Sequence, residues 1–124
     1  MEPNLSNYMQ NQIRQAQQIE AQLEQLAAQR YQLEARIKEI EKTLKELQAV
    51  SDDTPVFKSV GNVIYRVDDR KKLLDDLSEQ KELSEIRLKT IDRQQKALED
   101  KYKELEASIQ KRYEEETRKG GSVS

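Results

Sequence analysis

Apolar residues recur at alternating spacings of three and four along two long stretches of the chain, which a short break separates. This heptad repeat covers residues 9–47 and 74–112, and its spacing is typical of coiled-coil helices. The residues at heptad positions a and d are together called the seam. Position a holds Met9, Ala16, Leu23, Arg30, Ile37, Leu44, Leu74, Lys81, Leu88, Gln95, Tyr102 and Ile109. Position d holds Gln12, Ile19, Leu26, Leu33, Ile40, Leu47, Leu77, Ser84, Ile91, Leu98, Leu105 and Arg112.

The repeat predicts two helices, over about residues 5–49 and 69–116, in a single structural unit that covers residues 1–124. Ser6 is the expected N-cap of the first helix, and Asp68 or Asp69 that of the second. Pro55 and the small polar residues before it end the first helix, because proline cannot donate a backbone hydrogen bond. Residues 117–124 are expected to form a flexible tail.

The break in the repeat predicts a β-hairpin over about residues 56–67. Two β-branched runs flank Gly61-Asn62, and a two-residue loop of this kind is a strong hairpin signal. Alternation puts large apolar side chains on both faces and leaves both strand edges open, so we expect further strands to join, most simply from other copies or relatives. The expected oligomerisation residues are Val56, Phe57, Val60, Gly61, Asn62, Val63, Ile64, Tyr65 and Val67. The alternative is a hairpin folded down onto its own helices.

The seam also predicts how the helices pair. If they run antiparallel and Leu47 faces Leu74, the polar seam residues lie opposite apolar ones. Leu23 then pairs with Leu98, Ile19 with Tyr102, Lys81 with Ile40, Ser84 with Ile37 and Gln95 with Leu26. The far ends of both helices would meet about 65 Å from the hairpin, at 1.5 Å per residue.

Composition narrows the class of protein. Charged residues make up 37% and hydrophobic residues 35%, with one Phe and no Trp, so a thick globular core is disfavoured. The net charge is -2 with many charges of both signs, which argues against general binding of nucleic acids. We expect no membrane span, because no stretch approaches about 18 apolar residues. We also see no signal peptide, which makes the cytoplasm the default location.

The sequence lacks most of the side chains on which catalytic sites depend. His and Cys are absent, so the commonest general base, the thiol nucleophile and the usual zinc ligands are missing. Gly61 has no phosphate-loop pattern around it, and carboxylates along solvated helices are most simply surface charges. We expect no enzyme, no cofactor and no metal.

The order helix, hairpin, helix resembles the prefoldin subunits, and the single hairpin resembles their beta type. The most specific part is the segment VFKSVGNVIYRV, residues 56–67, and the run IRLKTIDRQQ, residues 86–95, is also similar. The resemblance covers nearly the whole chain. It implies a mostly α fold, in which a long antiparallel two-helix coiled coil is joined by one β-hairpin that oligomerises into a β-barrel platform.

The resemblance also implies a function. Prefoldins are cytosolic, ATP-independent co-chaperones, in which two alpha-type and four beta-type subunits join, grip unfolded proteins at the coiled-coil tips and pass them to a group II chaperonin. The expected substrate-binding residues at the tips, where splayed ends would expose apolar groups, are Leu5, Tyr8, Met9, Ile13, Ile109 and Tyr113. The alternative function is a structural coiled coil or a filament-forming prefoldin-like protein.

Overall fold

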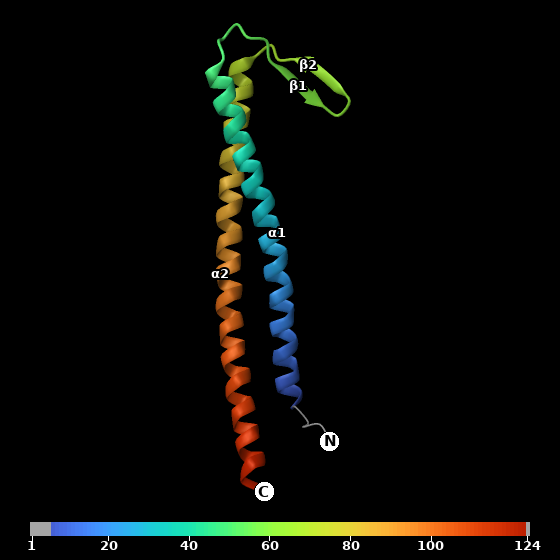
Figure 1. The fold of residues 1–124 in the computed structure, drawn as a ribbon, viewed down its shortest axis with the longest axis vertical. Coiled ribbons are helices and arrows are strands. Elements are labelled where there is room, and N and C mark those ends of the chain that lie inside the picture. The colour runs from blue at the N-terminus through green and yellow to red at the C-terminus, as the bar shows by residue number, and fades with distance from the viewer. Residues whose placement is uncertain (1–5, 124) are drawn as a thin grey trace. The chain divides into compact units, whose positions relative to one another are not determined.

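The computed structural model describes residues 6–123, with side chains up to residue 118. It contains two long helices, α1 (Asn7–Ala49) and α2 (Arg70–Val123), with the strands β1 (Phe57–Val60) and β2 (Val63–Arg66) between them (Figure 1). This confirms the predicted helix–hairpin–helix fold. The chain divides into two compact units, which we describe separately. The hairpin unit is Arg30–Thr90, and the tip unit combines Met1–Gln29 with Ile91–Ser124.

Side chains cap the start of each helix. The Met9 amide donates to Ser6 Oγ at 3.2 Å, which confirms Ser6 as the N-cap of α1. At the start of α2, the Lys72 amide donates to Asp69 Oδ1 at 3.0 Å, so Asp69 rather than Asp68 is the cap. Each oxygen satisfies one of the amides that the first turn of a helix leaves without a partner.

The seam forms the core. Every seam residue is buried or half-buried except Arg112, which is exposed. The most buried ones, each 2–8% exposed, are Met9, Gln12, Ile19, Ile37, Ile40, Ser84 and Ile91. The heptad pattern therefore predicts which face each helix buries, because side chains three and four residues apart lie on one side of a helix.

Contacts within each unit agree with the predicted antiparallel pairing. In the hairpin unit, Lys81 Nζ lies 3.5 Å from Glu41 Oε1, next to its predicted partner Ile40. In the tip unit, the Tyr102 hydroxyl donates to Glu20 Oε1 at 2.5 Å, next to its predicted partner Ile19. Figure 1 shows the first half of α1 running antiparallel beside the later part of α2.

The hairpin has the predicted strands and loop. β1 and β2 pair antiparallel, with Val60 opposite Val63 across Gly61-Asn62. Gly61 has a φ of 56°, and no non-glycine residue in the described part of the chain has a positive φ. A positive φ at the first loop residue alone is the arrangement of a type II′ turn, whose twist matches that of the strands.

The end of α2 differs from the prediction. The sequence predicted a helix to about residue 116 and a flexible tail over 117–124, whereas α2 continues to Val123. Contacts between successive turns continue to residue 116: Gln110 Nε2 donates to Glu114 Oε1 at 3.1 Å, and Arg112 Nε lies 3.9 Å from Glu116 Oε1. Beyond residue 116 the helix needs no new nucleation, because each further residue adds one backbone hydrogen bond to an existing helix.

Candidate assembly and binding surfaces

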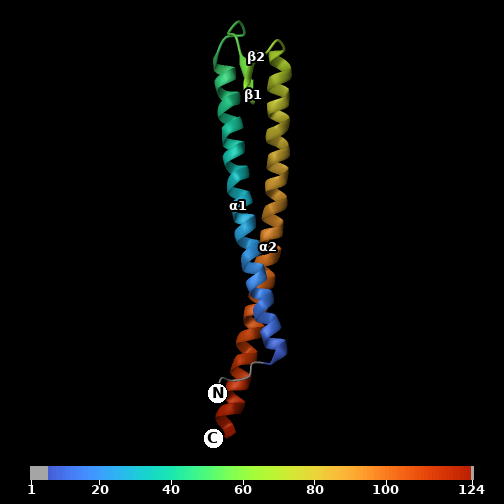
Figure 2. The same ribbon diagram turned by 90° about the vertical axis from the view of Figure 1, so that its right-hand side faces the viewer.

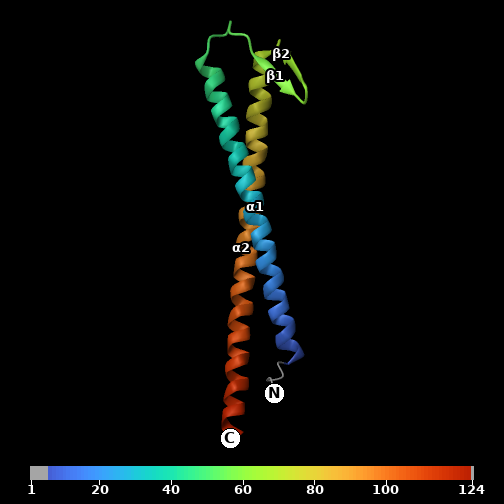
Figure 3. The same ribbon diagram turned by 45° about the vertical axis from the view of Figure 1, so that its right-hand side comes forward.

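The hairpin exposes large apolar side chains on both faces. Their exposed fractions are 61% for Phe57, 52% for Val60, 61% for Val63, 70% for Ile64 and 45% for Tyr65. Every residue of both strands is exposed, so nothing in the described chain covers either face. Figures 1 and 3 show the hairpin standing to one side of the neighbouring helix ends, and Figure 2 shows it in front of them. The alternative in which the hairpin packs down onto its own helices is therefore wrong.

The two faces of the hairpin have different surroundings. Lys58 pairs with Tyr65 on one face, and these residues line a shallow groove with the first turns of α2. Charged residues such as Asp69 and Lys72 also line this groove. The opposite face carries Phe57 and Ile64, together with Ser59 and Arg66. Each face therefore exposes large apolar side chains: Phe57 and Ile64 on one, and Val60, Val63 and Tyr65 on the other.

The strand edges are unpaired within the described chain, because the sheet contains β1 and β2 alone. Just outside the strands, the Val67 amide donates to the Val56 carbonyl oxygen at 2.8 Å, and both of these valines are half-buried. Free edges and two apolar faces are the features by which a hairpin recruits further strands.

The tip, defined here as the start of α1 with residues 108–113 of α2, exposes two aromatic rings. Tyr8 is 55% exposed and Tyr113 is 54% exposed. The guanidinium carbon of Arg112 lies 5.1 Å from the centroid of the Tyr8 ring, within range of a cation–π contact. Ile13 and Ile109 are half-buried, and Leu5 lies outside the described residues.

Splayed helix ends were expected to expose Met9, but the structure buries it. It is 2% exposed, the most fully buried large side chain among the described residues. Met9 occupies an a position, and its flexible thioether can fill the irregular space that a seam with polar neighbours leaves. The first turn of α1 therefore buries its seam residue. The exposed apolar surface of the tip consists mainly of Tyr8 and Tyr113.

Gln12 forms a buried polar contact that the sequence did not predict. Its Nε2 donates to Ser108 Oγ at 2.9 Å and to the Tyr8 hydroxyl at 3.1 Å. Gln12 is 7% exposed, and its Oε1 has no hydrogen-bond partner. The predicted pairing, in which Leu47 faces Leu74, also puts Gln12 opposite Ile109, and it overlooked Ser108 beside Ile109. The signal was available, because a polar residue at a d position requires a polar partner nearby.

The titratable side chains of the described residues do not meet the requirements of a metal site. Among the described residues, no group of three or more acidic side chains could hold a metal ion. The hydrogen bond that Tyr102 donates to Glu20 raises the pKa of the Tyr102 hydroxyl above its usual value of 10.0, because it favours the protonated form. In the described part of the chain, neither helix has a segment that is long and apolar enough to cross a membrane.

Comparisons with known proteins agree with this arrangement. The family model described as "Prefoldin subunit" matches residues 10–116. The prefoldin subunit beta of Thermoplasma volcanium is 56% identical over 120 residues, covering 97% of each chain. That of Thermoplasma acidophilum is 54% identical over 122 residues, covering 98% of each chain. The crystal structure of the prefoldin beta subunit from Thermococcus strain KS-1 superimposes with a TM-score of 0.78 at 32% identity, covering 89% of this chain and 96% of that one.

Proposed function

Because this chain belongs to the prefoldin family, as a subunit of the beta type, we propose that it is part of an ATP-independent co-chaperone that holds unfolded proteins. The hairpin is the assembly element in this proposal, and the tips of the coiled coils bind the unfolded chain. The complex then delivers its cargo to a group II chaperonin in the cytoplasm. No nucleic acid, membrane or cofactor takes part.

The exposed hairpin is the observation that carries the proposal. Five large apolar side chains in a twelve-residue segment are 45–70% exposed. Burying each one stabilises an assembly by up to about 1.5–3 kcal/mol, while pairing the strand edges satisfies the free backbone groups. In the proposed complex, two alpha-type and four beta-type subunits join their hairpins into a closed β-barrel, which leaves no edge strand.

The tip residues suit a binder that accepts many sequences. Tyr8 and Tyr113 offer large apolar faces with polar ends, and aromatic rings lose little entropy when they bind because they have few rotatable bonds. Ile13 and Ile109 of the same tip are half-buried, and Met9 is buried. These residues, together with Leu5, become additional apolar contacts for an unfolded chain when the first turn of α1 opens. Weak, adaptable contacts of this kind allow promiscuous binding.

An aggregation assay tests the proposal. The chain is mixed with an alpha-type prefoldin subunit, and light scattering follows chemically denatured citrate synthase after dilution without ATP. We expect the complex to suppress aggregation. A shortened chain of residues 15–107, which lacks the tip, should still assemble but lose the suppression. A correctly assembled full-length complex that leaves the aggregation unchanged would rule out the holdase function.

A filament-forming or purely structural role is the second candidate, and the open edges of β1 and β2 favour it. Unpaired edges can join in an open series as well as in a closed ring. Particle size separates the two candidates. A single closed species with the alpha-type partner supports the chaperone complex, whereas particles that lengthen with concentration support a filament.

A further inference from the structure

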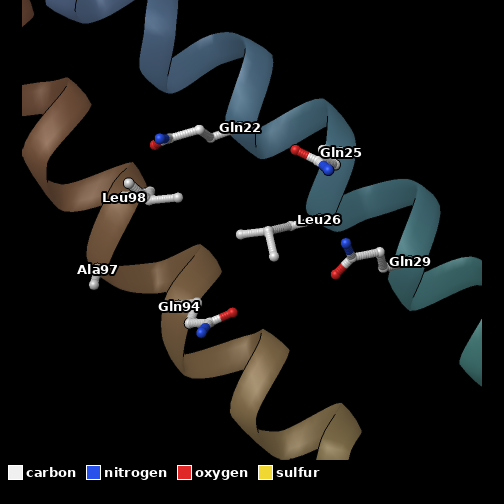
Figure 4. A pocket seen from close by; sticks show the side chains of 7 residues that line it. All are labelled: Gln22, Gln25, Leu26, Gln29, Gln94, Ala97 and Leu98. Atoms are coloured by element: carbon white, nitrogen blue, oxygen red, sulfur yellow. The ribbon is translucent and has the colours of Figure 1, made fainter.

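A groove in the tip unit has an unusual lining. It lies between α1 and α2 and is lined by Gln22, Gln25, Leu26, Gln29, Gln94, Ala97 and Leu98. None of these side chains is charged, although 37% of the residues in the chain are. Leu26 and Leu98 are half-buried and form the floor, and the glutamines are exposed around it. Figure 4 shows Gln22 and Leu26 extending from α1 toward α2, and Gln94 extending from α2 toward α1.

The four amides of the groove are available for a ligand. No hydrogen bond joins them to another described residue. Each glutamine amide offers two donor hydrogens and an acceptor oxygen, the same groups that a peptide backbone requires. The groove therefore combines hydrogen-bonding groups of both kinds with an apolar floor, and it carries no charge that would select for a charged ligand.

The spacing of the amides fits an extended polypeptide. Gln22, Gln25 and Gln29 lie three and four residues apart, and hence on one side of α1. The seven steps from Gln22 to Gln29 rise about 10 Å along the helix. An extended chain covers that length in about three residues, at about 3.3 Å each. One side chain of such a segment would point at the floor while the backbone faces the glutamines.

We propose that this groove, which we call the glutamine groove, is a second client-binding site that takes an uncharged, extended segment of unfolded polypeptide with an aliphatic side chain on Leu26 and Leu98. This inference rests on the proposed holdase function and adds a site away from the tip. Another helix of this chain is a poorer occupant, because its charged faces would be desolvated against uncharged amides. Nucleic acid is also a poorer occupant, since the lining offers no cation to the phosphates.

Photo-cross-linking from single cysteines tests the site. The chain has no cysteine, so Gln25→Cys labelled with benzophenone-maleimide reports on the groove alone. Gln18→Cys is the matched control, because Gln18 is exposed on the same helix and does not line the groove. Tyr113→Cys reports on the tip. Each variant is assembled with the alpha-type subunit and irradiated with denatured citrate synthase. We expect several-fold more cross-linking from Gln25→Cys than from Gln18→Cys.

Charge substitutions provide a second measurement. Gln22→Glu with Gln29→Glu keeps the side-chain shape but removes two amide donors, and it should weaken binding of a blocked peptide of alternating valine and serine by about tenfold. Ala21→Glu with Ala28→Glu adds the same charge at two exposed positions on the outer face of α1 and should leave the affinity unchanged.

The outcomes separate the two proposals. If Gln25→Cys cross-links no more than Gln18→Cys while Tyr113→Cys captures the client, the glutamine groove is not a binding site and the holdase function stands. If no position captures the client and aggregation is not suppressed, both proposals fail. Equal weakening by the groove pair and the outer-face pair would also overturn the groove site.

Discussion

Arg70, the first residue of α2, donates a hydrogen bond of 2.8 Å from its guanidinium to the carbonyl oxygen of Ser51, just beyond the end of α1. The same side chain also donates to the carbonyl oxygens of Leu47 and Val50. The last carbonyl groups of a helix have no partner within the helix, and a cation there also favours the helix dipole. One side chain at the base of the hairpin thus joins the end of α1 to the start of α2.

Substitution of Arg70 should loosen this base. We expect Arg70→Ala to lower the free energy of unfolding by about 1.5–3 kcal/mol, because charge-assisted hydrogen bonds to otherwise unpaired carbonyls are lost. Thermal unfolding followed by circular dichroism measures the change. Lys71→Ala, at an exposed neighbouring position, is the control and should change stability by less than about 0.5 kcal/mol. Equal melting temperatures for both variants would mean that the Arg70 contacts contribute nothing.

The buried amide of Gln12 should lower the stability of the tip. Its Oε1 is buried without a partner, which costs about 1–3 kcal/mol. We expect Gln12→Leu to stabilise the protein by about 1 kcal/mol, since Ser108 and Tyr8 are accessible enough to bond to water once the amide is gone. Chemical denaturation measures the difference, with Gln18→Leu on the exposed face as the control. A loss of stability in Gln12→Leu would show that the two hydrogen bonds outweigh the unpaired oxygen.

The turn of the hairpin should depend on Gly61. A Cβ added at Gly61 would meet nothing within 4 Å, so the effect of a side chain there comes from its φ of +56° alone. Gly61→Ala should cost about 1–2 kcal/mol, and Gly61→Asn should cost less because asparagine tolerates this conformation. The concentration needed for half-maximal assembly with an alpha-type subunit reports the cost. Tyr31→Ala, at an exposed position on α1 outside the hairpin, should assemble normally. If Gly61→Ala assembles as well as Gly61→Asn, the turn conformation does not limit assembly.

Alkaline pH should weaken the contact between Tyr102 and Glu20. The pKa of Tyr102 is raised in the folded chain, mainly by its hydrogen bond to Glu20, so the folded state holds this proton more tightly than the unfolded state does. The stabilisation is complete below the usual pKa of 10.0 and is lost as the pH rises through the higher folded value. The melting temperature of the wild type should therefore exceed that of Tyr102→Phe by a constant amount at neutral pH, and by less above pH 10. Tyr31→Phe, on an exposed face, should show no such trend. A difference in melting temperature between the wild type and Tyr102→Phe that is the same at all pH values would contradict a stabilising role of the Tyr102 proton.

The sequence predicted the fold well because its strongest signals are local. The heptad spacing identified the buried face of each helix, Ser6 identified the start of α1, and Gly61-Asn62 identified the turn. The side-chain contacts at the tip were harder to predict. Burial of Met9 and the bond from Gln12 to Ser108 depend on how two helices distant in sequence fill one layer, and periodicity alone does not describe that packing. The bridge from Arg70 to the end of α1 likewise depends on the geometry of the hairpin base.

The mass of the complex tests the central claim that the exposed hairpin drives assembly. Light scattering after size-exclusion chromatography measures this mass for the chain mixed with an alpha-type prefoldin subunit. We predict one closed species with the mass of two alpha-type and four beta-type subunits for the wild type. Ile64→Asp, which puts a charge beside Phe57 on one face of the hairpin, should abolish it, whereas Tyr31→Asp, at a position 75% exposed on α1, should not. A wild-type chain that remains unassembled, or an Ile64→Asp variant that assembles with unchanged mass, would contradict the account.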